Sequence, residues 1–168
     1  MNMADSTSTL ELVHSANDAP SAQIAHAHAV VQKFKSLYLA MNVDTISEAS
    51  LRDVYAEDIR FMDPFHSISG LPDLTEYFRG LYENVGYVHF DFTEQLVLPE
   101  KAMLTWQMTY NHPKLNRGKA IRVEGCTHLG MATRIYHHRD YFDAGQMLYE
   151  QIPLLRSAVG HLKKRMSS

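Results

Sequence analysis

The sequence predicts an α+β fold in which helices precede a long run of antiparallel strands. Two features support this class. Apolar residues recur at helical spacing in three segments between residues 24 and 82. From residue 87 onward, four segments alternate or are rich in β-forming residues, and short turn sequences separate them. Strands joined by short turns pair as an antiparallel meander, so we expect three helices packed on one face of the sheet.

Three helices are predicted before the main group of strands. The first runs from residue 24 to near Asn42, and the second begins at Ser47 with Ser50 nearby as a helix-start signal. Residues 59–63 extend as a strand, and a third helix follows Gly70. The apolar stripe of the first helix consists of Val30, Val31, Phe34, Leu37, Tyr38 and Met41.

The chain divides into three parts. Residues 1–22 are rich in Ser, Thr, Asn and Asp and are expected to form a flexible arm. Residues 23–152 form the α+β domain. Residues 153–168 are predicted to be a short C-terminal helix, whose final cations favour the negative end of the helix dipole. The longer strands of the domain are expected at residues 88–92, 102–111, 120–129 and 134–143.

Composition excludes several functions. The 168 residues carry a formal net charge of -3, with 45% hydrophobic and 21% charged residues, which is typical of one soluble globular domain. No dense basic stripe is present, so nucleic acid is not expected as a partner. No apolar run approaches the roughly 20 residues that span a bilayer, so no membrane partner is expected. A single cysteine and a start without a secretory signal predict a cytoplasmic protein.

No motif for a metal or cofactor is found. His26 and His28 are two residues apart in a helix, and His137 and His138 are adjacent in a strand, so the side chains of each pair point apart. The sequence has no Gly-rich phosphate loop and no Ser or Cys nucleophile motif. We therefore expect neither a metal nor a cofactor.

Asp63 is the first candidate for catalysis. It ends an apolar strand, and Pro64 stops the strand because proline cannot donate to a sheet ladder. Desolvation beside Phe61 and Phe65 would disfavour the ionised carboxylate, which suits a general base. The alternative is that Asp63 starts a turn, as Asp does where chains reverse.

The order of elements resembles the nuclear transport factor 2-like superfamily, specifically its SnoaL-like branch. The resemblance covers roughly residues 24–152 and is carried by Asp63-Pro64 closing the first strand, Gly70 opening the third helix and Tyr141-Phe142-Asp143 closing the last long strand. It implies a cone-shaped cystatin-like roll, in which a curved antiparallel sheet wraps around three helices and a pocket opens at the wide end. Members include ketosteroid isomerase, polyketide cyclases, scytalone dehydratase and limonene epoxide hydrolase, together with non-enzymatic accessory domains.

The resemblance also bears on single residues. Asp63 is similar to the Asp-Pro position that supplies the proton-abstracting carboxylate in ketosteroid isomerases. Those enzymes add a tyrosine on the first helix and a protonated acid on the penultimate strand. The nearest positions here are Phe34 or Tyr38 and Gly125, so the oxyanion donors do not match. Ketosteroid isomerisation itself is therefore not expected.

Strand parity gives two further candidates, His138 and Asp140. Alternate residues face opposite sides of a strand, so one face of the last long strand carries Tyr136, His138, Asp140 and Phe142. Aligning Phe142 with a pocket aromatic of related isomerases places His138 and Asp140 inside the cone. There His138 could act as the acid partner of Asp63, or bind a water with Asp140. In the alternative, Asp140 forms an ordinary charge pair and the histidines lie at a subunit contact.

The expected pocket wall collects side chains from several elements. His66 could curl over the pocket mouth or lie solvated in its loop. The penultimate strand has an apolar row that must face the core, so its other row, Arg122, Glu124, Cys126 and His128, is expected on the convex surface. Sheets of this superfamily commonly pair there, and we expect a homodimer through the sheet. The expected pocket-lining residues are Phe34, Tyr38, Phe61, His66, Trp106, Tyr136 and Phe142.

Two functions remain from these observations. The first is binding of a small hydrophobic molecule in a conical pocket, with cofactor-independent acid-base chemistry of a lyase, isomerase or hydrolase and Asp63 as the base. The second is a non-catalytic ligand-binding or dimeric accessory protein of the same fold. An enzyme needs Asp63, His138 and Asp140 to converge in a partly apolar pocket, whereas an accessory protein can have its cone filled by side chains.

Overall fold

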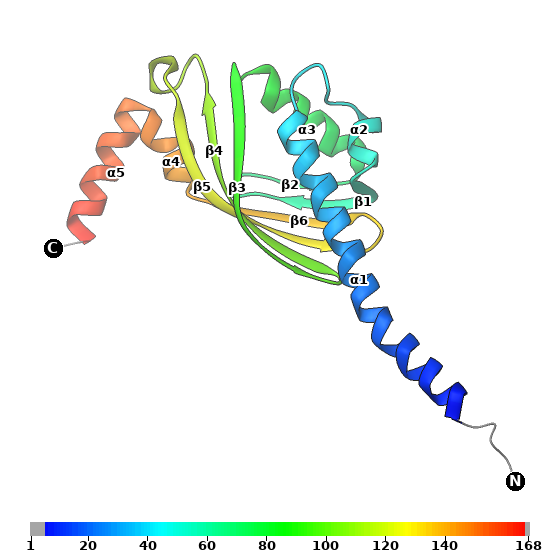
Figure 1. Cartoon of the computed structure of the whole chain (residues 1–168). Coiled ribbons are helices and arrows are strands. Elements are labelled where there is room, and N and C mark those ends of the chain that lie inside the picture. The colour runs from blue at the N-terminus through cyan, green and yellow to red at the C-terminus, as the bar shows by residue number, and fades with distance from the viewer. Residues whose placement is uncertain (1–5, 167–168) are drawn as a thin grey trace, which may run out of the picture.

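The computed structural model describes the backbone of residues 6–166 and the side chains of that range except those of residues 6–20, 153, 154, 156 and 163. Helices come first and a long sheet follows (Figure 1). The elements are α1 (Ser6–Ala40), α2 (Glu48–Arg52), β1 (Tyr55–Met62), β2 (Ser67–Ser69), α3 (Leu71–Glu83), β3 (Tyr87–Leu98), β4 (Lys101–Asn111), η1 (Asn116–Gly118), β5 (Ile121–Met131), β6 (Ile135–Phe142), α4 (Ala144–Met147), η2 (Tyr149–Gln151) and α5 (Pro153–Met166).

A curved six-stranded sheet forms the body of the domain, in the order β2-β1-β6-β5-β4-β3 (Figure 1). The predicted α+β class is confirmed, but the sheet is mixed. β1 runs parallel to β6, with Phe61 opposite His138 and Met62 opposite Arg139. Short connections force consecutive strands from β3 to β6 to run antiparallel. The connection from β1 to β3 contains α3, so it does not force β1 to run antiparallel to its neighbour. The parallel pair brings the end of β1 beside the middle of β6.

The C-terminal half of α1 packs on the inner face of the sheet. Val31 and Phe34 are almost completely buried there, and the Phe34 ring lies 6.0 Å from that of Phe92 on β3. Figure 1 shows the N-terminal half of α1 projecting beyond the sheet, while α2 and α3 lie beside its C-terminal end. The apolar stripe predicted for this helix therefore faces the core.

The first helix begins earlier than predicted. Residues 6–22 continue α1 as one helix, where an irregular arm was expected, and residues 1–5 lie outside the described range. The prediction rested on the polar composition of this segment. Adding residues to an existing helix avoids the unfavourable nucleation step. The packed C-terminal half of α1 can therefore extend the helix into residues 6–22, although the polar composition of that segment does not predict a helix.

Local signals place α2 and α3. Ser47 Oγ accepts a hydrogen bond from the Ser50 backbone N–H at 3.1 Å, and Ser50 Oγ accepts one from the Ser47 N–H at 3.1 Å, which is a reciprocal helix cap. Gly70 precedes α3 with φ of 95°, a conformation that favours glycine because it has no Cβ. Both helix starts agree with the sequence prediction.

The inner face of the sheet carries the predicted apolar rows. Side chains of β4 and β5 on this face are buried, whereas Arg122 and Glu124 on the other face are exposed and Cys126 and His128 are partly exposed. Among the described residues, no helix has the length and apolar character required to cross a bilayer. The buried rows are Leu104, Trp106, Met108 and Tyr110 on β4, and Ile121, Val123, Thr127 and Leu129 on β5.

Candidate functional site

Asp63 lies just beyond the end of β1 and is almost fully buried, at 7% exposure. Its Oδ1 accepts hydrogen bonds from the backbone N–H groups of Phe65, at 2.7 Å, and His66, at 2.6 Å. Its Oδ2 accepts a hydrogen bond from the Tyr77 hydroxyl on α3. Asp63 thus closes the turn that Pro64 begins, which is the alternative that the sequence left open.

His138 and Asp140 form a second polar centre, on β6. His138 has no exposed surface, and its Nε2 lies 2.8 Å from Asp140 Oδ1. Its Nδ1 lies 2.9 Å from the Tyr55 hydroxyl, which is in turn 3.3 Å from the Tyr38 hydroxyl. A neutral imidazole satisfies both contacts, with Nε2–H donating to Asp140 and Nδ1 accepting from Tyr55. A protonated ring would satisfy them as well, by donating from both nitrogens.

Asp140 receives a further donor from β5. The Thr127 hydroxyl donates to Asp140 Oδ1, and Trp106 Nε1–H donates to Thr127 Oγ1 at 2.8 Å. Two donors therefore converge on one oxygen of Asp140. In the described part of the chain, Asp140 Oδ2 accepts no hydrogen bond, while the side chain keeps 14% exposure.

Gly125 makes room for Trp106. A Cβ at Gly125 would lie 2.4 Å from the Trp106 ring and 2.8 Å from the Tyr141 carbonyl oxygen, which real Cβ atoms do not tolerate. The indole thus occupies the space where the resemblance to ketosteroid isomerases would place an acid. The mismatch at this position has a packing cause.

Burial keeps the tyrosine hydroxyls of the site protonated. It is the largest cause that raises the pKa of Tyr38 and of Tyr55 well above the ordinary value of 10.0. The pKa of Tyr77 is also raised, first by burial and then by its hydrogen bond to Asp63. At neutral pH these hydroxyls are uncharged donors around two carboxylates.

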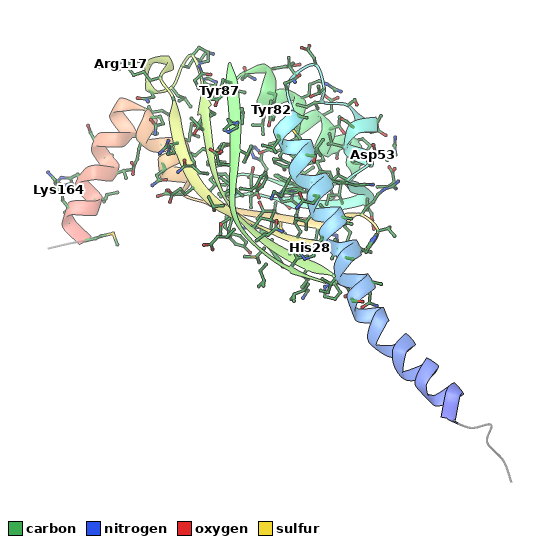
Figure 2. All side chains as sticks on the ribbon, in the orientation of Figure 1. His28, Asp53, Tyr82, Tyr87, Arg117 and Lys164 are labelled. Carbon is green, nitrogen blue, oxygen red and sulfur yellow. The ribbon has the colours of Figure 1, made fainter. Side chains whose placement is uncertain are left out.

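A cavity of about 110 Å³ opens beside these groups, between α1, α3 and the inner face of the sheet. Asp63 and Asp140 both lie in its wall. Figure 2 shows side chains filling the space between α1 and the sheet, with Tyr82 labelled at the end of α3. The lining residues are Tyr38, Met41, Phe61, Asp63, Tyr77, Phe78, Leu81, Tyr82, Val85, Val88, Phe90, Trp106, Met108, Tyr110, Asp140, Phe142 and Met147.

Some predicted pocket residues do not line this cavity. His138 and Phe34 lie behind its wall, with their rings 5.5 Å apart. His66 is half exposed, with its Nδ1 3.4 Å from Asp63 Oδ1. The other expected lining residues, Tyr38, Phe61, Trp106 and Phe142, do line it.

Tyr136 lies on the other side of the sheet, with 43% exposure, and the parity prediction for it is wrong. Gly130 pairs with His137 and Met131 with Ile135, so the ladder skips Tyr136 as the extra residue of a β-bulge. Parity therefore holds only from His138 onward. The bulge turns Ile135 inward and Tyr136 outward.

Sequence reasoning missed Tyr55, Tyr77 and Thr127. Each lies beside apolar residues, Tyr55 after Val54, Tyr77 before Phe78 and Thr127 in the inner row of β5. A hydroxyl in an otherwise apolar row is the available signal, because a buried hydroxyl needs a partner. Within the described side chains, no group of three or more His, Cys, Asp or Glu residues has the arrangement of a metal site.

The mixed curved sheet, the helices on its inner face and the cavity between them define a nuclear transport factor 2-like domain. A family model for the SnoaL-like domain matches residues 31–138, so the chain belongs to the SnoaL-like family. No curated protein matches the sequence.

Solved structures with the same fold have low sequence identity. An LEH-like epoxide hydrolase from M. tuberculosis is 18% identical with a TM-score of 0.60, covering 77% of this chain and 86% of its own. A Jannaschia protein described as a SnoaL-like polyketide cyclase is 11% identical with a TM-score of 0.63, covering 73% and 90%. A protein from Catenulispora acidiphila with a ketosteroid isomerase-like fold, solved in complex with trimethylamine, is 14% identical with a TM-score of 0.61, covering 73% and 91%. These likenesses concern the fold.

Proposed function

We propose that the chain binds a small, mainly apolar molecule in this cavity and that Asp140 is its acid-base group. The observation that carries the proposal is the state of the two Asp140 oxygens. Thr127 and His138 hold Oδ1, whereas Oδ2 accepts no hydrogen bond from the described chain and belongs to a side chain of the cavity wall. A base must have a lone pair that can reach the substrate.

Asp63, the base expected from the sequence, is the weaker candidate. Its Oδ1 caps two backbone N–H groups and its Oδ2 accepts the Tyr77 hydroxyl, so both oxygens already hold the fold together. A proton taken on Oδ1 would break one of its two backbone hydrogen bonds, at a cost of about 1 to 3 kcal/mol, and a proton on Oδ2 would have to share that oxygen with the Tyr77 hydroxyl. In this proposal Asp63 positions Tyr77 in the cavity wall.

The proposed reaction class is cofactor-independent proton transfer, as in a lyase, isomerase or hydrolase. Asp140 would take a proton from the bound molecule on Oδ2. The N–H of His138 and the hydroxyl of Thr127 would hold the carboxyl group in place through the transfer. The names of two relatives, an epoxide hydrolase and a polyketide cyclase, support chemistry on small organic molecules.

Proton exchange into small cyclic ketones tests this proposal without knowledge of the natural substrate. Cyclopentanone and cyclohexanone are incubated with the protein in heavy water, and loss of their α-proton signals is followed by NMR. We expect exchange above the buffer rate, reduced about 100-fold or more in Asp140→Asn. The matched variant Asp63→Asn should retain exchange within about fivefold, because its side chain keeps the same shape.

The reverse result, with exchange lost in Asp63→Asn and kept in Asp140→Asn, would return the base to Asp63. If the ketones bind and no exchange occurs, the alternative of a non-catalytic ligand-binding or accessory protein is favoured. One observation already fits that alternative. The polar groups of the site form a closed network in which Tyr38, Tyr55 and Thr127 each have a protein partner, as in a structural core.

We also propose that a second copy of this chain covers the outer face of the sheet. A groove of about 320 Å³ lies there, next to the predicted contact row of β5, and large apolar side chains are exposed along it. Leu96 is 63% exposed and Tyr141 is 50% exposed. Light scattering at micromolar concentration should give twice the monomer mass, and Leu96→Glu should reduce it to that of the monomer.

A further inference from the structure

We infer that the molecule held in this cavity carries a positive charge, as a small alkylated ammonium group does. The inference rests on the proposed function, because it names the chemical class of the ligand for the same cavity. Three observations lead to it: the charge of the cavity wall, the aromatic lining and the size of the cavity.

The cavity wall carries two carboxylates without a lysine or arginine partner. Asp63 is 7% exposed and the Asp140 side chain 14% exposed. Among the described side chains, the only basic groups within ion-pair distance of them are the imidazoles of His66 and His138. A histidine carries charge only when it is protonated, so neither carboxylate has a permanently charged partner among these side chains. Buried charges are ordinarily paired, and a cation in the cavity would supply the pair.

The remainder of the wall favours an organic cation over a metal ion. Nine of the seventeen lining residues are aromatic, among them Phe61, Tyr77 and Trp106. Aromatic faces carry negative electrostatic potential and attract quaternary and other alkylated ammonium groups. Hard metal ions need six or more oxygen ligands, which an aromatic wall does not provide. An anionic ligand would be repelled by both carboxylates.

The size of the cavity fits such a head group. An apolar cavity of about 150 Å³ holds benzene, which has six heavy atoms. The volume of about 110 Å³ found here therefore suits a head group of roughly four heavy atoms, such as trimethylammonium. The rest of a larger ligand would have to extend beyond this volume.

Choline and 3,3-dimethylbutan-1-ol provide a direct test, since they have the same shape and differ in a charged nitrogen in place of a carbon. Trp106 is the only tryptophan of the chain and lines the cavity, so its fluorescence reports occupancy. Saturation-transfer NMR confirms binding independently. We expect choline to bind the parent protein about tenfold more tightly than the alcohol.

Two variants separate charge recognition from shape. Asp140→Asn should weaken choline binding about tenfold and change alcohol binding less than about twofold. Glu124→Gln, which removes an exposed carboxylate from the outer face of the sheet, should leave both affinities unchanged. Because each variant is compared on a matched ligand pair, a general loss of folding would weaken both ligands together and is detected by circular dichroism.

Four results would overturn the inference. If the alcohol binds as tightly as choline, the cavity binds small molecules but does not select a cation. If choline binds and Asp140→Asn leaves its affinity unchanged, the carboxylate is not the recognition group. If neither ligand binds while cyclohexanone does, the cation inference fails and the proposed function stands. Failure of all three probes would overturn the proposed function as well.

Discussion

The two carboxylates of the cavity wall are held by different parts of the chain. Asp63 is fixed from nearby, by backbone N–H groups two and three residues away and by Tyr77 on the helix that follows. Asp140 is fixed from afar, by Thr127 on a neighbouring strand and through His138 by Tyr55 on β1. The turn and Tyr77 therefore occupy both oxygens of Asp63, whereas tertiary packing orients Asp140 and, within the described residues, leaves its Oδ2 without a hydrogen bond.

This difference has a consequence for function. A carboxylate that closes its own turn is conspicuous in the sequence because the turn signal marks it. For Asp140, strand parity predicts the face that it shares with His138, but no local pattern predicts its partner Thr127 on the neighbouring strand. A clear turn signal in the sequence therefore does not show that a carboxylate has an oxygen without a hydrogen-bond partner in the fold.

Removal of His138 should have the largest effect on stability. In His138→Leu the apolar volume is kept, but the Tyr55 hydroxyl and Asp140 Oδ1 each lose a buried partner. We expect the free energy of unfolding to fall by about 3 kcal/mol, as measured by urea denaturation. His66→Leu, which changes a half-exposed ring on the Asp63 side, should cost less than about 1 kcal/mol. An equal loss of unfolding free energy in the two variants would show that the Asp140 side of the cavity depends on long-range contacts no more than the Asp63 side does.

Gly125→Ala should disturb the Asp140 side alone. The added methyl group would overlap the Trp106 ring, which donates to Thr127 and so supports Asp140. We expect a loss of about 2 kcal/mol in the free energy of unfolding and a shift in Trp106 fluorescence. Gly80→Ala, in α3, is the control, because a Cβ there meets no atom within 4 Å. An unchanged fluorescence spectrum in Gly125→Ala would contradict the packing of Trp106 against Gly125.

Asp63 can be tested as a turn residue with two substitutions. Asp63→Ala removes the acceptor of two backbone N–H groups and of the Tyr77 hydroxyl, and should cost about 2 kcal/mol. Asp63→Asn keeps an oxygen for the backbone and should cost less than about 1 kcal/mol. Thermal denaturation of both variants measures the difference. A loss in Asp63→Asn as large as in Asp63→Ala would point to the charge of Asp63, and not its turn, as the stabilising feature.

Ionisation of the buried tyrosines should have the smallest effect on stability at neutral pH. At high pH the effect becomes measurable. Burial raises the pKa of Tyr110 to about 12 and raises the pKa of Tyr38, Tyr55, Tyr77 and Tyr82 as well. A raised pKa in the folded state means that the protonated form favours folding. This contribution is fully present below the unfolded pKa of about 10 and is lost as pH rises through the folded pKa.

Absorbance of tyrosinate between about pH 9 and 13 checks this expectation, with circular dichroism recorded in parallel. Five of the nine tyrosines of the chain should ionise only together with unfolding. The same titration in urea serves as the control, and there all nine should ionise near pH 10. Ionisation of all nine near that pH with the fold intact would contradict the burial of these hydroxyls.

Much of the fold was determined by local sequence signals. The Ser47–Ser50 helix start, Gly70 before α3 and the turns between the strands each act within a few residues, where short-range chemistry decides the conformation. The alternation of apolar and polar residues along β4 and β5 also predicted the buried rows, because successive side chains of a strand point to opposite faces. The Asp63-Pro64 turn belongs to this class as well, and its structural role was among the stated alternatives.

Tertiary structure alone decided the rest. The parallel pairing of β1 with β6 depends on contacts between segments about eighty residues apart, which no local pattern records. The bulge at Tyr136 reverses strand parity because β6 places one extra residue between its pairs with Gly130 and Met131 of β5. The chain from Trp106 through Thr127 to Asp140 exists only when three strands lie side by side. Sequence thus determined which residues are acidic, apolar or turn-forming, while packing determined the hydrogen-bond partners of each acid in the cavity wall, since burial and hydrogen-bond partners are properties of the assembled fold.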